Sequence, residues 1–252
     1  MLKSLVSLGS SYAAGPSLSP VADSAARRSE SNYAHIVASQ LSMELIDLSV
    51  SGATLSNMFD ISQKAGRHTF DPQIQNVPRS ADLILVLGGG NDIGYISRLF
   101  IDCFTSTWVT NSVWKLANVF GNLLPVYSDD EETVRRNYGR LLDSLHERAP
   151  GAQILVVEYL TLIGPATTSH HLPISDEKRK FYETLAQRLQ SATSDAVKDR
   201  GQWCRQVPVA SRSLDHGLGS TEPWLNGFSW SLFLKKGGGV LHPNELGMQN
   251  VA

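Results

Sequence analysis

The sequence has 252 residues, which is long enough for one large domain that buries about three quarters of its unfolded surface. Its composition is that of an ordinary globular protein, with 42% hydrophobic and 18% charged residues. The 22 basic and 24 acidic residues leave a net charge of −2, and no Lys/Arg stripe occurs, so a nucleic-acid-binding protein is disfavoured.

The first third of the chain alternates short apolar runs with a helical pattern. Residues 2–9 are predicted to form a strand, residues 27–42 an amphipathic helix, and residues 43–50 a second strand. Residues 82–90 (DLILVLGGG) begin as an unbroken apolar run. Such a run is typical of a strand that both layers of helices cover in a parallel sheet.

Residues 127–151 carry the clearest helical pattern. Ser128 and Glu131 are spaced as a capping box, acidic residues crowd the first turn, and the Pro150-Gly151 pair ends the helix.

Three further predicted elements continue the alternation: a strand over 152–160, a capped helix over 175–201 and a fifth strand over 204–210. Strands and helices that alternate at this spacing predict an α/β protein with three α/β/α layers and a central parallel sheet, as in flavodoxin-like folds. No repeat or long linker divides the chain, so residues 1–252 are interpreted as a single domain.

Residues 96–127 interrupt the alternation with an apolar, aromatic-rich segment, interpreted as a helical insertion. It is either a pair of core helices or a cap over a site. In the second case Trp108, Trp114 and Phe120 are the candidates for lining a substrate pocket.

Targeting signals and cysteine patterns are sparse. The N-terminal apolar run is too short for a secretory signal, and no stretch reaches the length of a membrane-spanning helix. Cys103 and Cys204 have neither metal-ligand nor disulfide-framework spacing, so we expect free, buried thiols. A cytoplasmic location is the expectation, and secretion of a processed form stays open.

The first three predicted strands all end in small, polar residues. These ends are Gly9-Ser10-Ser11, residues 49–53 (SVSGA) and residues 88–92 (GGGND). Ligands of open α/β sheets bind beyond the carboxyl ends of the strands, and small residues leave backbone amides free to reach them. The three ends therefore predict a shared site at one edge of the sheet.

Several common site motifs are absent from the sequence. GGGNDIG fails the dinucleotide pattern because Ile93 stands at the third glycine, and no P-loop follows. Ala13 breaks the G-x-S-x-G pattern around Ser11. H-E-x-x-H does not occur, and the adjacent His170-His171 pair lacks ligand spacing, so no metal is expected.

Four blocks in order resemble the SGNH or GDSL hydrolase superfamily: LGSSYAAG (8–15), SGAT (51–54), GGND (89–92) and HPN (242–244). Stretches such as NYAHIVASQL, DLSVSGAT, GGGNDIGY and LVVEYL are similar to a microbial, often fungal, branch of it. In HPN the proline suits the first turn of a terminal helix. The resemblance implies that the two ends of the chain meet.

The resemblance also implies roles for these residues. Ser11 corresponds to the nucleophile, with Ser10 in place of the usual Asp, and His242 to its base. The oxyanion hole would consist of the backbone N–H groups of Ser11 and Gly52 and the side-chain amide of Asn91. Asp92 is expected to brace its loop.

One position departs from the family pattern, because Gly239 stands where an Asp normally precedes the histidine by three residues. Such a carboxylate orients the imidazole and stabilises the imidazolium. Three explanations remain open: a backbone carbonyl near Gly239 or Val240 replaces it in a Ser-His dyad, Asp215 or Glu222 fills in, or the protein is a weak or inactive hydrolase.

The implied function is a serine esterase that hydrolyses carboxylic esters, with short acyl or acetyl groups, through an acyl-enzyme. The alternatives are a non-catalytic or weakly active ligand-binding protein of the same fold, or an acyltransferase that uses the same intermediate. The resemblance implies no cofactor, and a small-molecule ester as the only partner. The sequence leaves the oligomeric state open.

Overall fold

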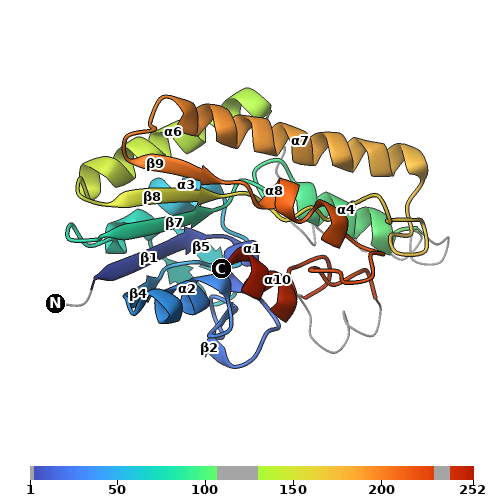
Figure 1. Cartoon of the computed structure of the whole chain (residues 1–252), viewed down its shortest axis with the longest axis horizontal. Coiled ribbons are helices and arrows are strands. Elements are labelled where there is room, and N and C mark those ends of the chain that lie inside the picture. Colours follow the sequence, from blue (N-terminus) through green and yellow to red (C-terminus); the bar gives the residue numbers. More distant parts are fainter. Residues whose placement is uncertain (1–2, 107–129, 230–238) are drawn as a thin grey trace.

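A computed structural model describes residues 3–106, 130–229 and 239–252 of the chain and confirms the predicted three-layer α/β class (Figure 1). Its centre is a five-stranded parallel sheet in the order β4-β1-β7-β8-β9. The strands are β1 (Ser4–Gly9), β4 (Glu44–Asp47), β7 (Leu83–Leu87), β8 (Gln153–Val157) and β9 (Cys204–Val207).

The middle of the sheet is covered on both faces. Strand β1 lies between β4 and β7, and its Leu5 is in register with Leu45 on one side and Leu83 on the other. Leu5, Val6 and Leu8 are fully buried. Two-sided burial explains why the central strands read as unbroken apolar runs.

Helices form the two outer layers, as the connections of the sheet require. Right-handed crossovers put helices on opposite faces when the chain changes direction across the sheet. One face carries α3 (Leu55–Phe59), α6 (Glu131–Arg148) and α7 (Asp176–Lys198), and the other α2 (Tyr33–Leu41) and α10 (Glu245–Val251) (Figure 1). The packing of α6 on α7 and of α10 on α2 agrees with this division.

The remaining described elements lie mainly at the edge where the strands end. They are α1 (Ser11–Ala14), α4 (Tyr95–Phe104), α8 (Val209–Arg212), the 3-10 helices η1 (Gln73–Asn76) and η2 (Leu214–His216), and two hairpins, β2 (Val21–Asp23) with β3 (Arg28–Ser29) and β5 (Gln63–Ala65) with β6 (His68–Phe70).

Several predicted helix starts are wrong, because side-chain caps place them later. Helix α2 begins at Tyr33, where the Asn32 side chain accepts hydrogen bonds from two backbone amides. Helix α6 begins at Glu131 with Asp130 as its cap, since Asp130 accepts from the amide of Thr133, and the predicted cap Ser128 lies outside the described residues. Ser175 caps α7 as predicted.

Two further element boundaries, each next to a proline, also differ from the prediction. The fifth strand ends at Val207, because Pro208 cannot donate to the sheet and α8 follows it. Pro243 lies outside the terminal helix, whose N-cap is Asn244.

The predicted insertion at 96–127 is described only at its start. Helix α4 covers the first part and buries Tyr95, Leu99 and Cys103. Trp108, Trp114 and Phe120 lie outside the described residues. Cys103 and Cys204 are free and buried, as expected, and burial raises the pKa of each thiol to about 12.

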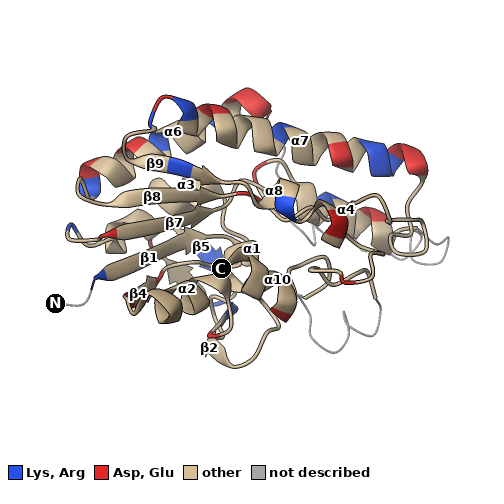
Figure 2. Cartoon of the chain, in the orientation of Figure 1, with Lys and Arg blue, Asp and Glu red and all other residues tan. Residues whose placement is uncertain are grey.

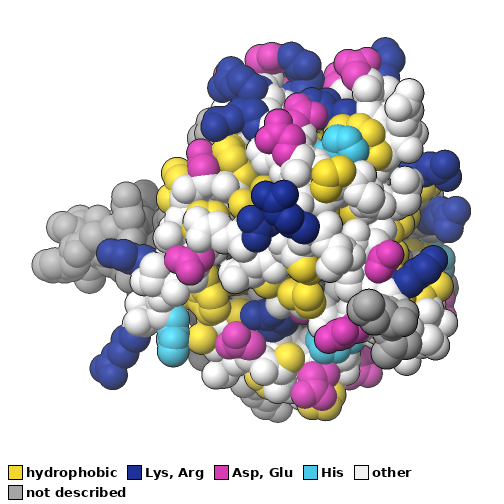
Figure 3. Space-filling view, turned by 90° about the vertical axis from the view of Figure 1, so that its left-hand side faces the viewer, with side chains coloured by type: hydrophobic (Ala, Val, Ile, Leu, Met, Phe, Trp, Pro, Cys, Tyr) yellow, Lys and Arg dark blue, Asp and Glu magenta, His cyan; other side chains and the backbone are white. Residues whose placement is uncertain are grey.

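Charged side chains are spread over the outer helices rather than gathered by sign. Figure 2 shows acidic and basic residues interspersed along α6 and α7, which Asp143 and Arg200 tie together through two hydrogen bonds of 2.6 and 2.7 Å. Basic and acidic groups also alternate on the face shown in Figure 3. Among the described residues, no helix has the length and hydropathy needed to cross a bilayer.

Candidate active site

Ser11 stands at the sharp turn from β1 into α1, at the carboxyl edge of the sheet. Gly9 makes this turn tight: a Cβ there would lie 2.6 Å from the Leu87 carbonyl oxygen and overlap the Cβ of Ala13. Ser10 is the N-cap and is fully buried, whereas Ser11 keeps part of its surface exposed. Of the two serines, the turn presents Ser11 to the surface.

His242 reaches this edge on a segment that the fold fixes from both sides. The chain around it pairs in antiparallel fashion with the segment around Leu225, through Leu225 and Pro243. The Asn226 amide donates to the His242 carbonyl at 2.9 Å. Immediately afterwards Asn244 caps α10 by accepting from the amide of Gly247.

The side chains of Ser11 and His242 meet although 231 positions separate them. The Ser11 Oγ lies 2.8 Å from the His242 Nε2, and the His242 Nδ1 lies 2.7 Å from the Val240 carbonyl oxygen. A carbonyl oxygen only accepts, so Nδ1 carries the proton and donates it. Nε2 then presents its lone pair to the hydroxyl of Ser11.

The surroundings of His242 favour the neutral imidazole. The pKa of His242 is lowered from its usual 6.5 to about 4, mainly by burial and to a smaller extent by the positive charge of Arg27. The hydrogen bond to Val240 acts in the opposite direction. The ring is therefore uncharged at neutral pH, which is the form that can accept a proton.

Neither of the two carboxylates considered in the sequence contacts His242. Asp215 is exposed in η2, and the exposed Glu222 has its Oε2 3.7 Å from the Nδ1 of His216. Gly239 contributes its backbone only: its carbonyl accepts the His242 amide at 3.4 Å. Among the described residues, the carbonyl of Val240 is the group on the Nδ1 side of the ring.

The three N–H donors named from the sequence follow the carboxyl ends of three adjacent strands, β4, β1 and β7. The amides of Ser11 and Gly52 have no acceptor among the described residues, and Gly52 is exposed with a φ of 85° that suits glycine. The Asn91 Nδ2 donates one of its two hydrogens to the Ala53 carbonyl at 2.8 Å. The second hydrogen remains for a ligand.

Asp92 braces the same loops, as predicted. Its buried carboxylate accepts the Leu55 amide at 3.1 Å, at the start of α3. Together with the bond from Asn91 to Ala53, this contact ties the loop after β7 to the loop after β4. The relative position of Asn91 and Gly52 is therefore fixed by two hydrogen bonds.

Sequence reasoning missed a pair of tyrosines that underlies the site. The rings of Tyr12 and Tyr159 pack with centroids 4.5 Å apart, and Tyr12 also faces the His242 ring at 5.4 Å. The Tyr159 hydroxyl accepts the Gly90 amide at 3.2 Å and shares a hydrogen bond of 3.0 Å with the Ser10 hydroxyl. The only sequence signal was their place: Tyr12 follows Ser11, and Tyr159 follows a predicted strand.

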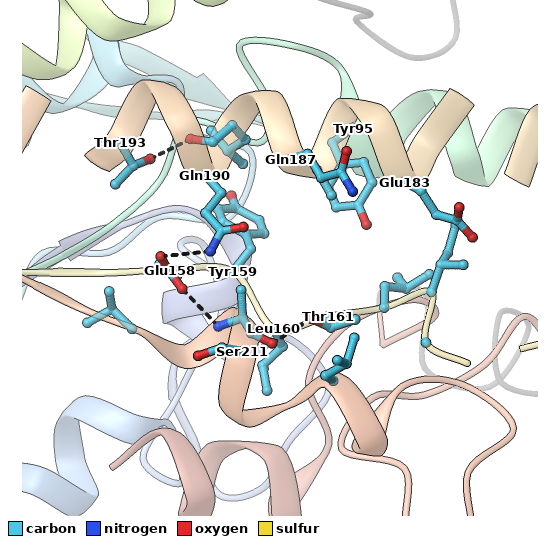
Figure 4. A pocket seen from close by; sticks show the side chains of 18 of the residues that line it. Tyr95, Glu158, Tyr159, Leu160, Thr161, Glu183, Gln187, Gln190, Thr193 and Ser211 are labelled. Atoms are coloured by element: carbon cyan, nitrogen blue, oxygen red, sulfur yellow. Dashed lines mark hydrogen bonds between the residues drawn. The ribbon is translucent and has the colours of Figure 1, made fainter. Parts of the chain in front are cut away.

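A cavity of about 430 Å³ opens on the other side of Tyr159, between α7 and the chain that follows β8 (Figure 4). Glu183, Gln187 and Gln190 line it from α7, and Leu160 and Leu162 line it from the chain after β8. Ser11 and His242 do not line this cavity. It therefore adjoins the candidate site through Tyr159 without containing it.

The carboxylate of Glu158 closes one end of this cavity and is structural. It is buried and accepts hydrogen bonds from the side chains of Gln190 and Gln206 and from the Ala210 amide (Figure 4). These contacts join β8, β9, α7 and α8. Within the described ranges, no group of three or more His, Cys, Asp and Glu residues is arranged to hold a metal.

Comparisons with known proteins agree with this fold. Phospholipase A1 from Streptomyces albidoflavus NA297 superposes with a TM-score of 0.71 at 21% identity, and the extracellular lipase from Streptomyces rimosus with 0.68 at 21%, each over 99% of both chains. A family 2 carbohydrate esterase from Corynascus thermopiles (Myceliophthora fergusii) gives 0.53 at 14% identity, over 99% of this chain and 64% of that one.

Sequence comparison defines the family more directly. No curated protein sequence matches this chain. The GDSL-like Lipase/Acylhydrolase family, however, matches residues 7–249, which include all four blocks of the sequence. The chain therefore belongs to the GDSL-like lipase/acylhydrolase family and is a carboxylic ester hydrolase.

Proposed function

We propose that this ester hydrolase cleaves small carboxylic esters through an acyl-enzyme on Ser11, with His242 as the base and the Val240 carbonyl in place of the usual carboxylate. The observation that carries the proposal is a pair of hydrogen bonds on the two sides of the His242 ring. One joins Ser11 Oγ to His242 Nε2 at 2.8 Å, and the other joins His242 Nδ1 to the Val240 carbonyl oxygen at 2.7 Å. A serine hydroxyl needs a base within hydrogen-bond reach to become a nucleophile.

Acylation begins when the Ser11 Oγ attacks the carbonyl carbon and its proton passes to the His242 Nε2. The negative charge that develops on the carbonyl oxygen would be held by the amides of Ser11 and Gly52 and by Asn91. The bond to the leaving oxygen then breaks, and His242 returns the proton to the departing alcohol.

Deacylation repeats these steps with water. His242 takes a proton from the water molecule as the water oxygen attacks the acyl carbon, and the proton returns to the Ser11 Oγ when the carboxylic acid leaves. Throughout both half-reactions, the Val240 carbonyl receives the Nδ1–H bond that keeps Nε2 directed at Ser11.

For the substrate we propose neutral carboxylic esters with a short acyl or acetyl group. The neighbouring cavity beyond Tyr159 does not include Ser11 or His242, and its 20 lining residues include no Lys, Arg or His that could bind a charged part of a substrate extending into it. The similar structures are named as a phospholipase, a lipase and a carbohydrate esterase, which supports an ester substrate for this chain.

Hydrolysis of p-nitrophenyl acetate and labelling by a fluorophosphonate serine probe test the proposal. We expect wild type to do both, and Ser11→Ala and His242→Ala to lose turnover by a factor of about 10³ or more. Ser11→Ala must also lose the label entirely, because no nucleophile remains at that position.

Ser10→Ala is the matched control, since Ser10 is the adjacent, fully buried serine. It is expected to keep the label. Labelling of Ser10 in the Ser11→Ala variant would refute the assignment of the nucleophile. A wild type that neither labels nor hydrolyses any of a series of p-nitrophenyl esters would favour the ligand-binding alternative.

A further inference from the structure

Leu241, between the carbonyl partner of His242 and His242 itself, has an unusual backbone conformation. Its φ is 60°, in the left-handed region that residues with a branched side chain rarely adopt. Such conformations persist only where the surroundings over-determine them, and they cluster at functional sites. The contacts that hold Leu241 therefore bear on how His242 is oriented.

The two peptide groups on either side of the Leu241 Cα are fixed separately. The first, which carries the Val240 carbonyl, donates its N–H to the Asn226 carbonyl at 2.9 Å. The second leads to His242, and its carbonyl accepts the Tyr12 hydroxyl at 2.8 Å. The relative rotation of these two groups sets the direction from His242 Nδ1 to the Val240 oxygen.

Tyr12 is well anchored for this purpose. It follows Ser11 on α1, its side chain is 1% exposed, and its ring packs against both Tyr159 and the His242 ring. The hydroxyl thus joins the turn that carries Ser11 to the turn that carries His242, across 229 positions of sequence.

We propose that Tyr12 is a positioning residue of the hydrolase: its hydroxyl holds the Leu241–His242 peptide so that the Val240 carbonyl can act as the acceptor for His242. This inference rests on the proposed function. Because position 239 is a glycine and not an Asp, the weaker acceptor, the Val240 carbonyl, must be held in place by other groups. The hydrogen bond from the Tyr12 hydroxyl to the Leu241 carbonyl does this.

Tyr12→Phe isolates the hydroxyl, because the ring and its packing remain. Among the described residues, the buried Leu241 carbonyl then has no partner, and only the 3.4 Å bond from the His242 amide to the Gly239 carbonyl still restrains this peptide group. We expect kcat for p-nitrophenyl acetate to fall by about ten- to a hundredfold, with KM unchanged, as is typical when a reacting group is misplaced without loss of binding.

Tyr182→Phe is the matched control. Tyr182 is equally buried, and its hydroxyl donates a hydrogen bond of 2.7 Å to Asp102, away from Ser11 and His242. It therefore loses a comparable bond without touching the His242 turn, and its kcat is expected to stay at the wild-type value.

Proton NMR provides a readout that does not depend on activity. A ring N–H that donates to a buried carbonyl exchanges slowly and resonates downfield. The resonance is assigned to His242 by its absence in His242→Gln. We expect it in wild type, Ser11→Ala and Tyr182→Phe, and its loss or broadening in Tyr12→Phe.

The outcomes separate this inference from the proposed function. A Tyr12→Phe variant with wild-type kcat and an intact downfield resonance overturns the positioning role. Equal losses of kcat in Tyr12→Phe and Tyr182→Phe also overturn it, because they point to general destabilisation. An inactive wild type whose resonance nevertheless disappears in Tyr12→Phe refutes the proposed function and leaves the role of Tyr12 in the turn supported.

Discussion

At the scale of single residues, the chemistry of the site depends on a histidine that is hard to protonate. A carboxylate partner would raise the pKa of His242, whereas the neutral Val240 carbonyl offers only a dipole. Burial dominates as a result, and the pKa of His242 is lowered to about 4. The base that we propose is therefore weak, but its neutral form, which can accept a proton, persists over a wide range of pH.

The lowered pKa of His242 predicts that the acid limb of the pH profile lies at an unusually low pH. Only neutral His242 accepts the Ser11 proton, so activity is lost as pH falls through the pKa in the free enzyme. We expect kcat/KM to stay constant from pH 7 down to about 5 and to reach half its value near pH 4. A steady-state profile with p-nitrophenyl acetate in buffers of constant ionic strength measures it.

Arg27→Gln tests one cause of the lowered pKa of His242. The charge of Arg27 opposes protonation of His242, so its removal is expected to move the acid limb to higher pH. Because Arg27 is exposed, this movement is small and greatest at low salt. An acid limb near pH 6.5 in wild type contradicts the low pKa of His242.

At the scale of elements, the geometry of the site is set by the junction between β1 and α1. Gly9 ends β1 beside the backbone of β7, with Ala13 of α1 directly over it. The absence of a side chain is what lets α1 start close to the sheet, with Ser11 in its first turn. A single methyl group at this point must push two elements apart.

Gly9→Ala is therefore expected to be among the more destabilising substitutions in the chain. The added Cβ would lie 2.6 Å from the Leu87 carbonyl oxygen, which belongs to rigid backbone. Overpacking of this kind typically costs about 1–3 kcal/mol and more where the neighbours cannot move. Urea unfolding followed by circular dichroism measures the loss, and Ser11 labelling reports the displaced turn.

Gly151→Ala provides the comparison at a glycine with free space. No heavy atom lies within 4 Å of a Cβ there, and its φ is not positive. Reduced freedom of the unfolded chain makes this change neutral or stabilising by about 0.4–1 kcal/mol. Similar unfolding midpoints for Gly9→Ala and Gly151→Ala would show that the junction tolerates a side chain.

At the scale of the whole molecule, the site exists because the turn after β1 and the segment before α10 meet, with the Ser11 Oγ 2.8 Å from the His242 Nε2. Figure 1 shows α1 and α10 next to each other, beyond the end of β1. Strand β1 sits inside the sheet, whereas His242 arrives on a segment that packs on the surface through α10. Met248 of α10 is 1% exposed and lies over Gly15, just after α1. Docking of this one helix holds the two halves of the site together.

Met248→Ala is expected to uncouple activity from the global fold. Truncation of a buried methionine costs about 2–5 kcal/mol, and here the loss falls on the docking of α10. In a urea titration, wild type should lose ester hydrolysis and circular dichroism at one midpoint. In Met248→Ala, hydrolysis should be lost at a lower urea concentration, because the His242 segment detaches before the sheet unfolds.

Leu145→Ala serves as the reference for a loss in the main core. Leu145 is fully buried in α6, on the other face of the sheet. Its truncation is expected to lower both midpoints together, since α6 unfolds with the sheet. If the two midpoints also coincide in Met248→Ala, α10 is part of the same cooperative unit and the uncoupling is refuted.

Local patterns were sufficient to predict the central strands and the main helices, but not all of their boundaries. Unbroken apolar runs identified β7 and the other central strands, because two-sided burial demands them. The alternation of strands with helices then predicted a parallel sheet. The polar strand ends predicted a site at one edge of that sheet, and the resemblance to a hydrolase family implied the roles of Ser11, Gly52, Asn91 and His242.

Only the tertiary structure decided which group faces the far side of His242. The sequence left Gly239, Val240, Asp215 and Glu222 as candidates, and distance selected the Val240 carbonyl. The same holds for Tyr12 and Tyr159, whose partners lie 229 and 149 positions away. A backbone carbonyl has no side-chain signature, and a hydroxyl placed across the fold leaves no spacing in the sequence. Such contacts are defined by how the elements pack, not by the order of residues along the chain.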